Sequence, residues 1–127
     1  MSRFRFVILE HDWPELHWDL LLEWKDVLRA WRLLAHPETR QAFAATAIAD
    51  HRRFYLDYEG PVSGNRGTVV RWDAGEFEWQ VDLPRRVSVM LDGKKCAGCL
   101  QLVWREGNDW QAEWIVEQQK TDSAHPR

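Results

Sequence analysis

Short segments rich in aliphatic and aromatic residues recur along almost the whole chain, with turn-forming residues between them. Strands of this length at regular spacing are typical of antiparallel β-barrels and β-sandwiches, so we predict an all-β fold. The turn signals are Lys25-Asp26, Asp73-Ala74-Gly75, Asp92-Gly93 and Gly107-Asn108, with a further break at Pro84. The predicted strands are 4–10, 16–24, 27–34, 43–49, 53–58, 68–73, 76–82, 86–91, 99–104 and 110–116.

The length of 127 residues is enough for one domain with a single hydrophobic core. We expect a β-barrel domain over residues 1–119 and a disordered tail over 120–127. Hydrophobic residues make up 45% of the chain, which favours folding over disorder. The segment 38–49 is rich in alanine, so its composition alone also allows a short helix.

The charge balance limits how the chain can contact nucleic acid. A domain held there by non-specific electrostatics should be basic, whereas the net charge here is −3. Any such contact must therefore be local. Tryptophan is unusually frequent, with nine residues, and most should line the barrel because Trp favours strands. Some could instead stack on bases, but the sequence does not indicate which.

Neither a membrane span nor a signal peptide is predicted. The chain has no apolar run of about 18 residues, and its first ten residues lack the apolar core and cleavage site of a signal peptide. We therefore expect a cytoplasmic, monomeric protein. Cys96 and Cys99 have no second pair to complete a zinc site, so they are predicted to be two thiols near a hairpin turn.

The segment from His11 to Asp19 places two imidazoles and a carboxylate close together. His17 and Asp19 are two apart in a predicted strand, so their side chains share a face. A tight connection through Trp13-Pro14-Glu15 would bring His11 back beside His17. Two His and one Asp that converge are typical ligands of a divalent transition metal. A single His-x-Asp pattern also occurs often on strands without a metal.

A second segment, Asp50 to Gly60, adds groups suited to an anionic substrate. It contains His51, two arginines and two tyrosines. Guanidinium groups bind phosphate bidentately, and a phenol can hold a further oxygen. The segment therefore favours a phosphate or carboxylate ligand beside the predicted metal site.

Five blocks in a fixed order extend these two segments over about residues 4–118. They are His11-Asp12-x3-Leu16-His17-x-Asp19, Leu28-x2-Trp31, Asp50-His51-x3-Tyr55, Glu59-Gly60 and Gly67-Thr68-Val69-Val70-x-Trp72-Asp73-x-Gly75. Together they resemble the 3′-phosphoesterase domain of bacterial ATP-dependent DNA ligase D, which also occurs as a stand-alone protein. The order and spacing of the blocks are far more specific than any one block.

The resemblance implies a compact antiparallel β-barrel with a polar active-site crater. It implies a metal-dependent phosphoesterase of DNA repair, which removes a 3′-terminal ribonucleoside and then a 3′-phosphate from a primer strand. The implied cofactor is Mn²⁺ or another divalent transition metal. The implied partners are the nucleic acid 3′ end of a primer-template and DNA-repair ligase or polymerase proteins.

Carried over by position, the resemblance assigns His11, His17 and Asp19 as metal ligands. It assigns His51 and Tyr55 to contacts with the phosphate, and His17 also counts among the catalytic residues. A metal ion would polarise a phosphoryl oxygen and offset developing negative charge. An imidazole can donate a hydrogen bond to the phosphate or protonate the leaving oxygen.

Two departures from the family pattern put efficient catalysis in doubt. Leu21 and Phe43 align with arginines that the family uses to bind phosphate. Each charged hydrogen bond lost in this way is worth about 1.5–3 kcal/mol. If the loss limits activity, Leu21→Arg should raise it. Candidate substitutes, whose places in the fold the sequence does not fix, are Arg32, Arg52 and Arg66.

Two other functions remain open. The same barrel could be a catalytically weak or inactive module that binds metal or a nucleic-acid end. Alternatively, His17, Asp19 and the distal His51 could form the facial triad of a non-haem iron oxygenase. The short span between His17 and His51 argues against that triad, as does the family resemblance, which makes His11 the third ligand.

Overall fold

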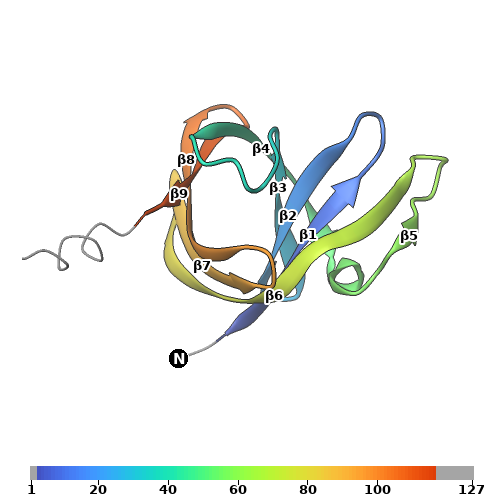
Figure 1. The fold of residues 1–127 in the computed structure, drawn as a ribbon, viewed down its shortest axis with the longest axis horizontal. Coiled ribbons are helices and arrows are strands. Elements are labelled where there is room, and N and C mark those ends of the chain that lie inside the picture. The colour runs from blue at the N-terminus through green and yellow to red at the C-terminus, as the bar shows by residue number, and fades with distance from the viewer. Residues whose placement is uncertain (1–2, 117–127) are drawn as a thin grey trace, which may run out of the picture.

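In the computed structural model, which describes residues 3–116, the chain forms an antiparallel sheet that closes into a barrel (Figure 1). The strand order is β1-β2-β3-β4-β9-β8-β7-β6, and pairing of β6 with β1 closes the eight strands, confirming the predicted all-β barrel. The elements are β1 Phe4–His11, β2 His17–Trp24, β3 Val27–Leu33, β4 Phe43–Arg52, the 3₁₀ turn η1 Arg53–Leu56, β5 Gly60–Pro61, β6 Thr68–Leu83, β7 Arg86–Gly93, β8 Ala97–Glu106 and β9 Asp109–Ile115. The tail predicted over 120–127 lies outside the described residues.

Most of the predicted strands and turns are confirmed. Lys25-Asp26 and Gly107-Asn108 form hairpin turns, and Pro84 lies in the turn between β6 and β7. The segment 38–49 forms no helix, because β4 from Phe43 onward pairs with both β3 and β9. Within residues 3–116, no helix is long and apolar enough to cross a membrane.

The predicted turn at Asp73-Ala74-Gly75 is wrong, because β6 runs through it as one strand of 16 residues. Here β6 passes from pairing with β1 to pairing with β7. Gly75 allows this crossing, since a Cβ there would lie 2.2 Å from the carbonyl oxygen of Asp92. The Asp73 carboxylate accepts backbone hydrogen bonds from Lys94, Lys95 and Cys96. Asp73 therefore anchors the β7–β8 turn.

The predicted strand over 53–58 is also wrong, because the chain forms η1 there. Pairing of β3 with β4 ends at Val27 and Arg52, so the chain beyond Arg52 has no neighbouring strand to join. η1 instead turns Leu56 into an apolar cluster. Fully burying such a side chain is worth roughly 1.5–3 kcal/mol.

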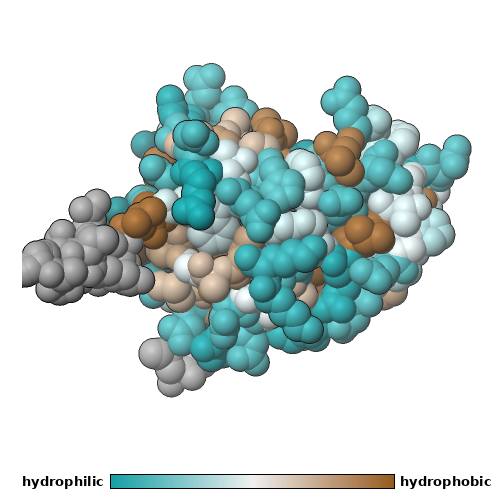
Figure 2. Space-filling view, viewed as in Figure 1, coloured by the Kyte–Doolittle hydropathy of each residue, from teal (hydrophilic) through white to brown (hydrophobic). Residues whose placement is uncertain are grey.

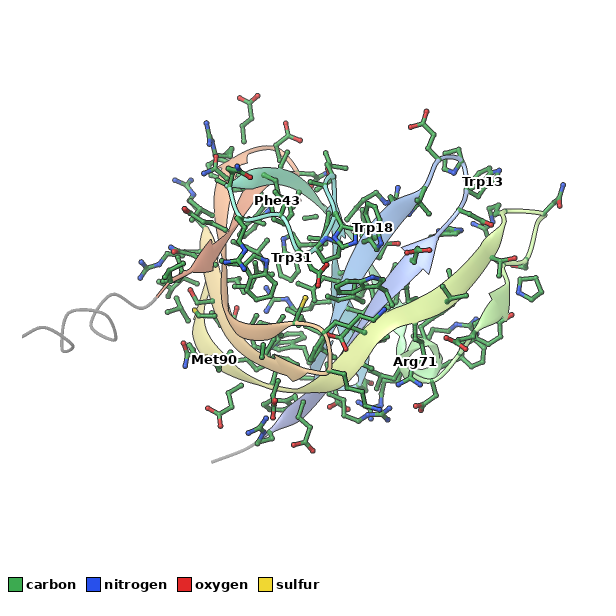
Figure 3. The ribbon with its side chains drawn as sticks, viewed as in Figure 1. Trp13, Trp18, Trp31, Phe43, Arg71 and Met90 are labelled. Atoms are coloured by element: carbon green, nitrogen blue, oxygen red, sulfur yellow. The ribbon has the colours of Figure 1, made fainter. Side chains whose placement is uncertain are left out.

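The barrel encloses the main core, which receives side chains from all eight barrel strands. Even-numbered residues such as Phe6 and Ile8 on β1, and Leu20 on β2, point inward. Trp31 and Phe43 also belong to this core, and Figure 3 shows both within the barrel. Figure 2 shows a largely hydrophilic surface with hydrophobic residues scattered singly.

A second apolar cluster lies on the outer side of the barrel wall. Odd-numbered residues of β1 and β2, including Val7, Leu9 and Leu21, pack there against Leu56 of η1. Tyr55, Tyr58 and Val62 are partly buried against the same cluster. The segment from η1 to the start of β6 therefore covers the outer face of β1 to β3.

The two cysteines lie at the β7–β8 hairpin as predicted, and both are thiols. Cys96 is buried, and its backbone N–H donates to Asp73. Burial, followed by the charge of Asp73, raises the pKa of the Cys96 thiol to about 12. Cys96 is therefore a small core residue rather than a reactive thiolate.

Burial of Leu21 means that Leu21→Arg should affect the stability of the fold before any effect on activity. The side chain is 0% exposed in the second apolar cluster, so an arginine would place a charge among aliphatic groups. We expect Leu21→Arg to lower the free energy of unfolding by on the order of 3–5 kcal/mol. Leu21→Met, which keeps the volume, should cost under about 1.5 kcal/mol. Urea unfolding of both variants measures this; equal stability of Leu21→Arg and wild type would contradict it.

Candidate metal centre

The β1–β2 hairpin brings His11 and His17 together as predicted. They are directly paired residues at the end of the hairpin, and their ring centroids lie 4.9 Å apart. Asp19 follows on the same face of β2, opposite Arg32 on β3. Ligand atoms of His11, His17 and Asp19 all lie within 4.8 Å of one another.

The hydrogen bonds of His17 leave one nitrogen without a donor or acceptor partner. Its Nδ1 lies 2.9 Å from the carbonyl oxygen of Glu15, so Nδ1–H donates to that oxygen in the neutral ring. Nε2 then carries the lone pair, is buried and has no hydrogen-bond partner. It faces Oδ2 of Asp19 at 3.4 Å. Two electron-pair donors that face each other in a buried site need either a proton or a cation between them.

A backbone carbonyl group also orients the ring of His11. Its Nε2 lies 2.8 Å from the carbonyl oxygen of Arg66, which can only accept. Nδ1 is therefore the nitrogen available as a ligand in the neutral ring. Donation by one ring nitrogen to a carbonyl is the usual way that proteins orient a metal-binding histidine.

Asp19 is a buried carboxylate with a compensating partner. Its side chain is 5% exposed, and Nε of Arg32 donates to Oδ1 at 3.1 Å. Burial would raise the pKa of Asp19, but the neighbouring His17 and Arg32 outweigh burial and hold that pKa below its usual value. The carboxylate is therefore ionised at neutral pH, with Oδ2 directed to His17.

The donor set fits a divalent transition metal. Two imidazole nitrogens and a carboxylate oxygen suit Mn²⁺, Fe²⁺ or Zn²⁺. The 3.4 Å between His17 Nε2 and Asp19 Oδ2 matches two bonds of about 2.1 Å that meet at roughly 110°. Among the residues that the structure describes, His51 does not join this group, so the alternative triad of His17, Asp19 and His51 is not formed.

A crater of about 420 Å³ opens beside the three residues, on the outer face of the barrel wall. The three candidate substitutes for the missing arginines, Arg32, Arg52 and Arg66, all line it together with His51 and Tyr55. The sequence could not place these arginines, because they come from β3, the end of β4 and the loop after β5. Two carboxylates, Asp19 and Asp50, also line the crater, so its three guanidinium groups leave an excess of positive charge that suits an anionic ligand.

His51 and Tyr55 lie on one wall of the crater. His51 Nδ1 donates to the carbonyl oxygen of Ala49 at 3.0 Å, which leaves Nε2 as the atom that can accept or deliver a proton. The two rings are 5.6 Å apart. Both lie where β4 passes into η1, so the turn that replaced the predicted strand positions Tyr55.

The three arginines differ in how many hydrogen bonds they already donate to the protein. Arg66 donates to the carbonyl and the hydroxyl of Ser63 in its own loop. Arg32 donates to Asp19, and its side chain is 35% exposed. Arg52 is exposed, with its guanidinium 5.5 Å from the ring of Phe54. Arg52 therefore has the most hydrogen-bonding capacity left for a ligand.

Leu21 and Phe43 do not line the crater. Leu21 shares the face of His17 and Asp19 but is covered by the second apolar cluster. Phe43 lies in the barrel interior, at the other end of β4 from His51. An arginine at position 43 would therefore not reach this crater along the same path as Arg32, Arg52 and Arg66.

The sequence missed what holds the rim of the crater in place. Oδ1 of Asp12 accepts the backbone N–H of Thr68 at 2.7 Å, which ties the β1–β2 turn to the start of β6. Gly67, at φ +78°, lies so close that a Cβ would be 2.3 Å from Asp12 Oδ1 and 2.6 Å from Cβ of Trp13. In the sequence, the only indication of the contact between Asp12 and Thr68 was an aspartate shortly after the predicted strand 4–10.

Two comparisons show which known proteins the sequence of this chain is similar to. The family described as DNA Ligase D 3′-phosphoesterase domain matches residues 9–104. The multifunctional non-homologous end joining protein LigD of Mycolicibacterium smegmatis is 31% identical over a match of 130 residues, gaps included. The match covers 90% of this chain. The chain spans only 17% of that relative.

Removal of the carboxylate charge should weaken metal binding without loss of the fold. In Asp19→Asn the amide keeps the shape but loses the anionic ligand, so we expect the affinity for Mn²⁺ to fall by at least roughly 10- to 100-fold. The signal of free Mn²⁺ in electron paramagnetic resonance measures the affinity. Glu15→Gln, which changes a neighbouring exposed carboxylate, is the matched control. Equal Mn²⁺ binding by Asp19→Asn and wild type would show that Asp19 is not a ligand.

Proposed function

Because the chain belongs to the DNA ligase D 3′-phosphoesterase domain family, we propose that it hydrolyses phosphate esters at the 3′ ends of nucleic acid during DNA repair. The first hydrolysis would release a 3′-terminal ribonucleoside and leave a 3′-phosphate, and a second would release that phosphate and leave a 3′-OH. The observation that carries the proposal is that a cluster of three metal-ligand candidates meets a crater lined by two of them, His11 and Asp19, together with His51 and three arginines.

His11, His17 and Asp19 would hold the metal ion, with Mn²⁺ as the first choice. When bound, a divalent cation offers Lewis-acid stabilisation of charge on a phosphoryl oxygen. Arg32 keeps Asp19 ionised and oriented toward the two histidines. The backbone carbonyls of Glu15 and Arg66 keep the two imidazoles turned to the same point.

The other crater residues would act on the phosphate itself. Arg52 donates hydrogen bonds to its non-bridging oxygens, and Arg32 and Arg66 add positive charge. Water attacks the phosphorus and forms the new P–O bond. His51, with Nδ1 committed to Ala49, delivers a proton from Nε2 to the leaving oxygen as the ester P–O bond breaks. Tyr55, beside His51, donates a hydrogen bond that orients the ester.

A second candidate function is a module that binds metal or a nucleic-acid end with little turnover. The engagement of Arg66 with Ser63 and of Arg32 with Asp19 favours it, because both guanidiniums are then less available to a phosphate. Under either function the natural partner is a nucleic-acid 3′ end. Ligase or polymerase proteins of the same repair process would then act on the healed end.

The test is Mn²⁺-dependent release of phosphate from a primer-template that carries a 3′-phosphate. We expect turnover by wild type and a loss of roughly 100-fold or more in His51→Ala, the usual size of a general acid contribution. His36→Ala is the matched control, because His36 is an exposed histidine that packs against Trp18 and Trp72, outside the crater.

The outcomes separate the two functions. Turnover that needs His51 but not His36 supports the phosphoesterase. Absence of turnover in a wild-type protein that binds Mn²⁺ favours the binding module. Full activity of His51→Ala would contradict the proton-transfer role assigned to His51.

A further inference from the structure

Trp13 differs from the other eight tryptophans in its exposure and in its contacts. It is 43% exposed, while the other eight are buried or partly buried. Those eight pack against the core, against another ring or against a cation, as Trp31 does with Trp110. Within residues 3–116, the indole of Trp13 has no hydrogen bond, ring partner or cation partner. Its role is therefore not explained by the stability of the fold.

The position of Trp13 relates it to the candidate site. With Pro14 it lines the crater that contains His11, Asp19 and Arg66. Figure 3 shows Trp13 at the tip of the β1–β2 hairpin, far from Trp31 and Phe43 in the barrel. An exposed aromatic ring at the edge of a cationic crater can take part in binding a ligand that has both an anionic and a flat apolar part.

The backbone of Trp13 is held before any ligand arrives. Asp12 exchanges two hydrogen bonds with Thr68, one through its side chain and one through its backbone N–H. Gly67 leaves just enough room for Cβ of Trp13. A backbone held in this way loses little conformational entropy on binding.

We infer that Trp13 is a stacking surface for the base of the 3′-terminal nucleotide, so that the site binds the nucleoside as well as its phosphate. This inference rests on the proposed function and specifies its substrate. Every base has a π-face, so stacking on an indole tolerates any sequence, as end processing requires. A phosphate among the arginines and a base on Trp13 would occupy the two chemically different parts of one crater.

Phe54 is the other exposed aromatic side chain near the site, but it is a poorer candidate. Its ring is 52% exposed, yet it packs against Tyr58 at 4.6 Å and lies 5.5 Å from the guanidinium of Arg52. It does not line the crater. The ring of Phe54 thus already has partners, whereas the ring of Trp13 has none among residues 3–116.

The test compares DNA strands with a 5′ fluorophore and a 3′-phosphate, which differ only in whether the last nucleotide carries adenine or is abasic. Fluorescence anisotropy in metal-free buffer measures binding without hydrolysis. We expect wild type to favour the adenine end by roughly 5- to 150-fold, the range for stacking of one base. Trp13→Ala should lose this preference, and Trp13→Phe should keep most of it.

Two further variants are matched controls. Leu16→Ala removes another exposed apolar side chain from the same hairpin, outside the crater, and should keep the preference. Phe54→Ala should keep it as well. A preference retained by Trp13→Ala, or lost in Phe54→Ala instead, would overturn the assignment of Trp13.

A strand that ends in a 3′-OH separates failure of this inference from failure of the proposed function. Wild type that favours a 3′-phosphate over a 3′-OH, but binds adenine and abasic ends equally, would refute stacking and leave the phosphate site standing. Wild type that binds 3′-phosphate and 3′-OH strands equally would refute the phosphate site and the inference that depends on it.

Discussion

Along β1 and β2, side chains alternate between the interior of the barrel and its outer face, and the position of the candidate site follows from this alternation. Even-numbered residues such as Phe6 and Leu20 fill the barrel. Odd-numbered residues lie outside, where Val7 and Leu21 form a second apolar cluster under η1. His17 and Asp19 lie on the same outer face, beyond this apolar cluster, and both are buried.

Partial burial decides the electrostatics of the site. A carboxylate with a 5% exposed side chain is stable only if charge compensates it, and Arg32 compensates one oxygen of Asp19. The other oxygen faces Nε2 of His17, whose second nitrogen is committed to Glu15. We propose that a divalent cation resolves this opposition, with His11 as a further ligand. The same residues are the ones that the family resemblance assigns as ligands.

Local patterns in the sequence were enough to predict the hairpin that joins His11 to His17, because strand alternation and a short turn leave little freedom. The spacing of turns likewise predicted an all-β fold, but the choice of a barrel over a sandwich came from the family resemblance. Other features depended on partners far away in the sequence. Near Gly75, β6 changes its pairing partner from β1 to β7. η1 forms because the pairing of β4 with β3 ends at Arg52. The convergence of Arg32, Arg52 and Arg66 required those long-range pairings too.

The central claim is that a divalent ion binds between His11, His17 and Asp19. Crystals grown with Mn²⁺, measured at the manganese absorption edge, test it most directly. The account predicts an anomalous difference peak about 2–2.3 Å from Nδ1 of His11, Nε2 of His17 and a carboxylate oxygen of Asp19. Absence of a peak, with His17 in direct contact with Asp19 as an imidazolium, would contradict the account.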